Sequence, residues 1–192
     1  MRSRGLAVTL ALAVALGART GPGAAASSER PEALRRLLVA AVNDADGFED
    51  RFDAEVWLLD MVTRLGPLVP EAPERFDILK AVHREATRAG LEPELVLSVI
   101  TVESRFDRYA ISEAGARGLM QVMPFWLEEI GRTGDDLFHV NTNLRFGCTI
   151  LRYYLDAEKG NLTRALARYN GSLGELWYPG RVFDAYRRRW SP

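Results

Sequence analysis

The feature that most constrains the fold is an apolar run that ends in a carboxylic acid. From Leu95 to Val102 the sequence reads Leu-Val-Leu-Ser-Val-Ile-Thr-Val, and Glu103 follows directly. A stretch that is apolar nearly all the way round a helix indicates a helix enclosed by core. Gly90 is suited to end the preceding helix, and Pro93 to begin this one. We therefore expect a buried helix that carries Glu103 at its C-terminal end.

The expected position of Glu103 opposes its ionisation. Burial disfavours a charged carboxylate, and so does the negative end of a helix dipole, so both raise its pKa. A Glu that stays protonated near neutral pH can serve as a general acid for a glycosidic oxygen. The helix alone leaves an alternative open, in which Glu103 is exposed and paired with Arg105 or Arg108.

The rest of the chain predicts further helices. Apolar residues recur at spacings of three and four, and no alternating pattern reaches a useful strand length. The predicted fold class is all-α, with a small helical N-terminal segment at 27–87 before a main domain at 88–192. The expected helices cover about 31–42, 53–65, 75–89, 95–103, a stretch through Trp126 and Leu127 to Gly131, 141 or 143 to 160, one from Asn161, and one from near Arg181.

The N-terminus predicts export. Residues 1–4 are basic, 5–18 are apolar but too short to span a bilayer comfortably, and small residues follow at 24–26. We expect a signal peptide over residues 1–26, cleaved after Ala26 or Ala18, with no integral membrane segment afterwards. The alternative is an uncleaved membrane anchor.

Composition and residue counts limit the function classes. A net charge of −1 argues against a nucleic-acid partner held by electrostatics. Cys148 is the sole cysteine, and we expect a small buried residue there rather than a nucleophile. His83 and His139 are too distant in sequence to suggest a zinc site. One cluster of acidic residues is also a candidate ion site, but its spacing does not match a calcium loop. That cluster is Asp46, Asp50 and Asp53. We expect neither a metal nor a cofactor.

Three blocks of sequence carry a family resemblance. They are Glu103-Ser104, the segment from Ser112 through Gly115 to Gly118-Leu119-Met120-Gln121, and Tyr169-Asn170-Gly171. Over roughly residues 88–182 the chain resembles the soluble lytic transglycosylase family, the goose-type-lysozyme-like SLT domain, in its proteobacterial periplasmic branch. It departs from many members at Arg108, where they have Pro, and at Trp126, where they have Thr.

The resemblance implies a lysozyme-like helical domain that acts in the periplasm on glycan strands of peptidoglycan. In this family one Glu, here Glu103, protonates the oxygen between N-acetylmuramic acid (MurNAc) and N-acetylglucosamine (GlcNAc). The muramic N-acetyl group assists at the anomeric carbon. The same Glu then takes the proton of the sugar's C6 hydroxyl, so a 1,6-anhydro product forms without water. No cofactor is implied.

The resemblance also assigns substrate-binding residues. Ser112 corresponds to a serine linked to the N-acetyl group, and Met120 and Gln121 correspond to residues that line the cleft. The hydroxyl of Tyr169 is expected near Glu103, and Asn170 is expected to hold two of the blocks together. For Met120, Gln121 and Tyr169, simple packing remains the alternative.

Three further residues are expected to support the site. Ser104 follows the acid and is expected to stabilise the local structure around it. Gly115 and Gly118 are expected to let backbone and sugar approach closely, because glycine has no Cβ.

Two other functions remain open. A goose-lysozyme-type hydrolase would need a second carboxylate in the cleft, and Asp107 and Glu113 are the candidates. Because Arg105 and Arg108 interleave with them, we expect both to be solvated. The other alternative is a catalytically idle glycan-binding or assembly module. The sequence does not indicate which envelope-complex partner, if any, the protein has.

Overall fold

The computed structural model describes Glu32, Arg36 and residues 51–130 and 132–191. Every regular element in these residues is helical, apart from two isolated bridges that join Arg117 to Ile111 and to Val122. The predicted all-α class is therefore confirmed. The expected signal peptide, nearly all of the helix at 31–42, Asp46, Asp50 and the expected helix end at Gly131 lie outside the described residues.

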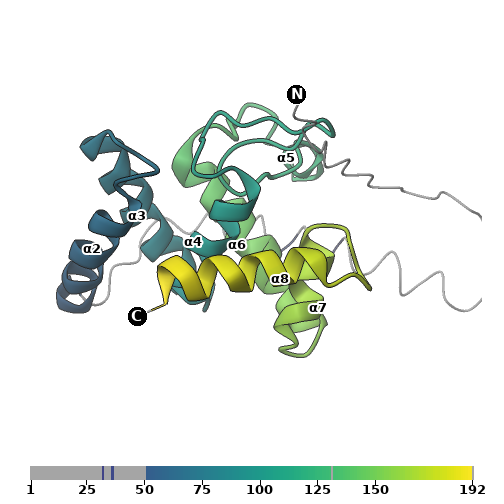
Figure 1. Cartoon of the computed structure of the whole chain (residues 1–192). Helices are drawn as coiled ribbons and strands as arrows, with labels where there is room; N and C mark the ends of the chain where they lie inside the picture. Colours follow the sequence, from purple (N-terminus) through teal and green to yellow (C-terminus); the bar gives the residue numbers. More distant parts are fainter. Residues whose placement is uncertain (1–31, 33–35, 37–50, 131, 192) are drawn as a thin grey trace, which may run out of the picture.

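Most of the helices follow one another with short connections, but a long loop at 104–124 separates α4 from α5 (Figure 1). None of those described is both long enough and apolar enough to cross a bilayer. The helices expected from residue 53 onward are found within a few residues of their predicted bounds, except the last. The elements are α2 (Arg51–Leu65), α3 (Ala72–Arg88), α4 (Pro93–Glu103), α5 (Phe125–Glu129), α6 (Val140–Ala157), α7 (Leu162–Tyr169), α8 (Trp177–Ala185) and a π-helical turn, η1 (Tyr186–Trp190).

The predicted start of the last helix near Arg181 is wrong. Helix α8 begins at Trp177, about one turn earlier, so Pro179 lies in its first turn. Proline is tolerated there because its missing N–H has no partner within the helix. The earlier start also makes Tyr178 a helical residue, which matters for the site.

Helix α4 lies at the centre of the fold. It contacts α3, α8 and η1, and each of its residues from Leu95 to Ile100 is buried. Trp190 is fully buried, and its Nε1 donates to Oγ1 of Thr101 across 2.8 Å. In Figure 1, α4 lies between the α2–α3 pair and the yellow C-terminal helix. The sequence expectation of a helix enclosed by core is confirmed.

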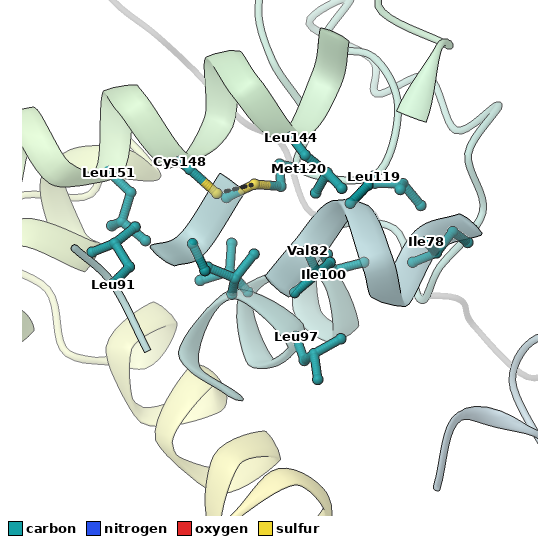
Figure 2. Packing of buried hydrophobic residues seen from close by; sticks show 14 of the residues in the cluster. Ile78, Val82, Leu91, Leu97, Ile100, Leu119, Met120, Leu144, Cys148 and Leu151 are labelled. Atoms are coloured by element: carbon teal, nitrogen blue, oxygen red, sulfur yellow. Dashed lines mark hydrogen bonds between the residues drawn. The ribbon is translucent and has the colours of Figure 1, made fainter. Parts of the chain in front are cut away.

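The core joins α3, α4 and α6 to the loop that follows α4 (Figure 2). Met120 from this loop packs against α6, with its Sδ 3.9 Å from Sγ of Cys148. Cys148 is buried, as expected, and burial raises the pKa of its thiol. A thiol held protonated in this way is not a ready nucleophile.

A buried charge also ties α3 to α6. Glu85 has no exposed surface, and its carboxylate accepts hydrogen bonds from Arg84, Arg88 and Arg145. Arg145 binds both carboxylate oxygens at 2.9 Å. Because α3 shares the core with α4 and α6, it packs as part of one body with the main domain. The predicted domain boundary at residues 87 and 88 stays a prediction.

Candidate functional site

A cleft of about 380 Å³ opens at the C-terminal end of α4. Its walls come from the end of α4, the loop that follows it, the start of α5, the middle of α6, the end of α7 and the first turns of α8. The lining residues include aromatic rings, amides and a few charged groups: Val102, Glu103, Ser112, Gln121, Val122, Met123, Phe125, Trp126, Ile150, Tyr154, Arg168, Tyr169, Asn170, Trp177, Tyr178 and Arg181.

Glu103 is the last residue of α4 and faces this cleft. Its Oε1 accepts a hydrogen bond from the hydroxyl of Tyr178 across 2.5 Å. Burial raises the pKa of Glu103 to about 7, and the bond from Tyr178, which favours the carboxylate, acts in the opposite direction. Both protonation states are thus populated near neutral pH, as a group that first gives and then takes a proton requires.

The chain turns sharply after Glu103. Arg105 and Phe106 have positive φ angles of 52° and 69°, which end the helix and reverse the chain. The hydroxyl of Ser104 donates to the carbonyl of Leu119 across 2.8 Å and accepts from the N–H of Phe106 at 3.2 Å. Ser104 therefore fastens the end of the acid-bearing helix to the returning loop.

Asn143 on α6 anchors that loop from the other side. Its buried amide accepts from the N–H of Met120 at 2.7 Å and donates to the carbonyls of Arg117 and Leu137 at 2.7 and 2.9 Å. Gly118 has a φ of +75°, and a Cβ there would lie 2.4 Å from both Asn143 Nδ2 and the Leu137 carbonyl. The lack of a Cβ at Gly118 thus accommodates the Asn143 side chain and the backbone carbonyl of Leu137. The expected close approach of a sugar stays a prediction.

Gly115 differs from Gly118 in its surroundings. Its φ of +85° also favours glycine, yet a Cβ there would have nothing within 4 Å. The turn that contains it is closed by a hydrogen bond from its N–H to the carbonyl of Ser112. Gly115 therefore serves the turn conformation, with open space beside it.

Four of the five expected substrate-binding residues line the cleft together with Glu103: Ser112, Gln121, Tyr169 and Asn170. Met120 does not, because its side chain is fully buried in the core. Its carbonyl instead accepts a hydrogen bond from the hydroxyl of Tyr169 at 2.7 Å. Tyr178 binds the acid and Tyr169 binds the loop, while Glu103 and Tyr169 line the same cleft. Burial and then the nearby charge of Glu103 raise the pKa of Tyr169, so the expected proximity of its hydroxyl to Glu103 stays a prediction.

The polar groups of these residues differ in the hydrogen bonds that they form within the protein. The Gln121 amide nitrogen donates to the carbonyls of Ala110 and Gly118, and Ser112 Oγ accepts from the N–H of Ala116. Asn170 Oδ1 is buried and has no hydrogen-bond partner among the described residues. Among the residues that the structure describes, Asn170 forms no side-chain hydrogen bond to another block, and the role expected for it stays a prediction.

Sequence reasoning missed several residues of the lining. Tyr178 was missed because α8 was expected to begin after it, although Pro179 was a signal for an earlier start. Trp177 and Arg181 join the cleft from the same helix, and Phe125 and Trp126 join it from α5. The rings of Phe125 and Trp126 lie 4.5 Å apart between centroids.

The candidate second acids do not line the cleft. Asp107 and Glu113 are both exposed, and Asp107 Oδ1 accepts from the N–H of Tyr109. Arg168, which does line the cleft, is paired with Glu158. In the part of the chain that the structure describes, no three His, Cys, Asp or Glu residues are grouped so that they could hold a metal ion.

Comparison with known proteins gives a family match. The family model of the transglycosylase SLT domain matches residues 80–186, beginning inside α3. The chain is 52% identical over 122 residues to membrane-bound lytic murein transglycosylase C of Actinobacillus pleuropneumoniae serotype 5b (strain L20), covering 55% of this chain and 33% of the relative. It is 31% identical over 129 residues to the protein of the same name from Yersinia pestis (strain Pestoides F), covering 58% and 35%.

A phage protein is also similar. The transglycosylase of Enterobacteria phage PRD1 is 34% identical over 100 residues, covering 48% of this chain and 37% of the relative. The chain therefore spans about a third of the length of the curated relatives it matches.

Proposed function

Because the chain belongs to the transglycosylase SLT domain family, we propose that it is a peptidoglycan lytic transglycosylase with Glu103 as its single general acid and base. The proposed reaction cleaves the β-1,4 bond between MurNAc and GlcNAc and leaves a 1,6-anhydro-MurNAc end. The names of the two bacterial relatives, which include "lytic murein transglycosylase", support this substrate class.

In the first step, protonated Glu103 gives its proton to the bridging oxygen as the bond to the muramic anomeric carbon breaks. A pKa of about 7 keeps much of the acid protonated near neutral pH. The muramic N-acetyl group supplies the electron pair at the anomeric carbon, so the protein need not provide a nucleophile. Ser112 and Asn170, both in the cleft lining, are candidates to orient that group.

In the second step, the Glu103 carboxylate takes the proton from the C6 hydroxyl of the same sugar. The C6 oxygen then bonds to the anomeric carbon and displaces the N-acetyl oxygen, which closes the anhydro ring. Tyr178 stabilises the carboxylate formed between the two steps, because its hydroxyl donates directly to Oε1. The acid is thereby returned to its protonated state.

One observation carries the proposal: among the residues lining the cleft, Glu103 is the sole carboxylic acid. A glycosidase that activates water ordinarily uses two carboxylates flanking the bond. The exposed positions of Asp107 and Glu113, away from the lining, argue against either as the base of a hydrolase. The presence of a single acid in the lining therefore favours the anhydro-forming reaction.

The test is mass analysis of the products released from purified peptidoglycan by the wild type and by Glu103→Gln. We expect anhydromuramyl products from the wild type and none from the variant. Reducing-end muramic products that depend on Glu103 would contradict the non-hydrolytic step and indicate a hydrolase. No release by either protein, with glycan binding intact, would favour the idle glycan-binding module instead.

We also propose that the protein acts in the cell envelope, where its substrate lies. The basic and apolar sequence of residues 1–26 supports export by a signal peptide. N-terminal sequencing of the protein purified from a periplasmic extract tests this. A mature end near residue 27 or 19 is expected, and an intact Met1 in a membrane fraction would contradict it.

A further inference from the structure

The first two turns of α8 present an aromatic ring and a cation to the cleft. We infer that Trp177 and Arg181 form a subsite for a muramic acid whose lactyl carboxylate is free, so that the protein prefers glycan strands stripped of their peptides. This inference rests on the proposed function and names its substrate more closely.

Trp177 has the properties of a platform for a sugar ring. It lines the cleft, and 42% of its surface is exposed although tryptophan is among the largest apolar side chains. Its ring meets that of Tyr178 edge to face, with centroids 5.8 Å apart, and Tyr178 in turn binds Glu103. Exposed apolar surface in a groove marks ligand contact, and an aromatic ring held in one orientation suits the flat face of a pyranose.

Arg181 lies one helical turn from both of these residues. At spacings of three and four along a helix, side chains share a face, with Cβ atoms about 5–6 Å apart. Arg181 therefore reaches the same region of the cleft as Trp177 and Tyr178, and it is part of the lining. A ring stacked on Trp177 would hold its substituents within reach of the guanidinium group.

The charge of Arg181 is available for a ligand. It has no ion pair or hydrogen bond among the described residues. The other cation of the lining, Arg168, is paired with Glu158, and that carboxylate also binds Arg164. Glu103, with a pKa of about 7, carries at most a partial negative charge near neutral pH. A carboxylate is the group that a guanidinium binds with two parallel hydrogen bonds.

The chemistry of muramic acid identifies which carboxylate fits. Its lactyl group hangs directly from the sugar ring, so its carboxyl group lies close to a ring stacked on Trp177. In peptidoglycan that carries peptides, this carboxyl group is an uncharged amide, and the peptide's own carboxylates begin several bonds further away. After that amide is hydrolysed, the free lactyl carboxylate places a negative charge next to the ring, within reach of the positive charge of Arg181. An amidase reaction that releases the peptide is thus the step that would supply this substrate.

Equilibrium binding tests the inference without turnover. The full chain carrying Glu103→Gln is titrated with a peptide-free GlcNAc–MurNAc tetrasaccharide, with the same glycan carrying its peptides, and with chitotetraose, which has no carboxylate. We expect the additional change Arg181→Ala to weaken binding of the peptide-free glycan by about fivefold to tenfold and to leave chitotetraose unchanged. Arg188→Ala, which removes an exposed arginine outside the cleft lining, is the matched control and is expected to change neither.

The role of Trp177 is tested with two variants and the same three glycans. Trp177→Ala is expected to weaken all three glycans, because stacking does not depend on charge, and Trp177→Phe to restore much of the loss. An equal loss for all three glycans on Arg181→Ala would overturn the assignment, as would a loss confined to the peptide-bearing glycan. Because binding is measured without cleavage, a failed product assay would refute the proposed reaction while leaving an Arg181-dependent preference intact.

Discussion

The hydroxyl of Tyr178 donates to Oε1 of Glu103 across 2.5 Å and so joins the start of α8 to the end of α4. This bond opposes the effect of burial on the acid, because it favours the carboxylate that burial disfavours. The acidity of Glu103 is therefore set by two elements that are distant in the sequence.

Tyr178→Phe is expected to raise the pKa of Glu103 further above its present value of about 7. A hydrogen bond to a charged group contributes about 1.5–3 kcal/mol, so a shift of about one unit or more follows. The basic limb of the pH–rate profile on peptidoglycan should move to higher pH by the same number of pH units as the pKa. Tyr169→Phe is the control, because its hydroxyl binds the Met120 carbonyl. It should lower stability by about 1–2 kcal/mol without moving that limb.

Glu103→Gln is expected to stabilise the fold at alkaline pH. The folded-state pKa of about 7 lies above the ordinary value of 4.5, which applies to the unfolded chain. Ionisation of the carboxyl group therefore lowers the stability of the fold progressively as the pH rises from 4.5 through 7. At pH 8 that cost is about 3 kcal/mol, and the uncharged amide avoids it. Urea denaturation at pH 4 and pH 8 measures the difference. A gain of equal size at both values would contradict this explanation.

Glu85→Gln is expected to destabilise the fold at neutral pH by about 3–5 kcal/mol, because it leaves three arginines around a buried site without a counter-charge. The arginines hold the pKa of Glu85 below its usual range. Its stabilising contribution is therefore present above the unfolded-state pKa and lost as the pH falls through the folded-state value.

The loss caused by Glu85→Gln should accordingly shrink in acid denaturation experiments. Asp60→Asn, which breaks a partly exposed pair with Arg64, is the control and should cost less than about 1 kcal/mol. If the Glu85 and Asp60 variants were equally stable at neutral pH, the account of the buried network would be wrong.

Gly118→Ala should cost clearly more stability than Gly115→Ala. Both glycines have positive φ, so each substitution carries a backbone cost of about 1–2 kcal/mol. Only the Cβ at residue 118 meets other atoms, 2.4 Å from Asn143 Nδ2 and the Leu137 carbonyl. Displacing Asn143 would also disturb its three hydrogen bonds to the loop backbone. Thermal denaturation of the two variants provides the comparison, and equal losses would show that the contact is relieved.

Glu103 could be predicted from sequence as the acid because the features that bury it and raise its pKa are local. The apolar run from Leu95 and the helix end at Glu103 are adjacent in the chain, and they give the burial and the direction of the pKa shift. Tyr178 lies 75 residues away, and its role depended on where α8 begins. Asn143 accepts a hydrogen bond from the backbone N–H of Met120, and Tyr169 donates to the backbone carbonyl of the same residue. Hydrogen bonds to backbone groups cannot be inferred from residue types alone.

The placement of Met120 shows a second limit of prediction from the sequence. A methionine in the Gly-Leu-Met-Gln block was expected in the cleft, with core packing as the alternative. Its side chain fills the space over Gly147, where a Cβ would lie 2.4 Å from its Sδ. Whether a loop side chain points into a cleft or into the core depends on the helix behind it, and here that helix offers a glycine.

The bond between Thr101 and Trp190 spans 89 positions, and the buried indole completes the packing around α4. A chain emerging from the ribosome therefore holds Glu103 long before it holds the residues that bury and orient it. Contacts this distant in sequence cost loop-closure entropy, so they slow folding. The packing around the helix that carries Glu103 therefore depends on a residue 89 positions further along the chain than Thr101.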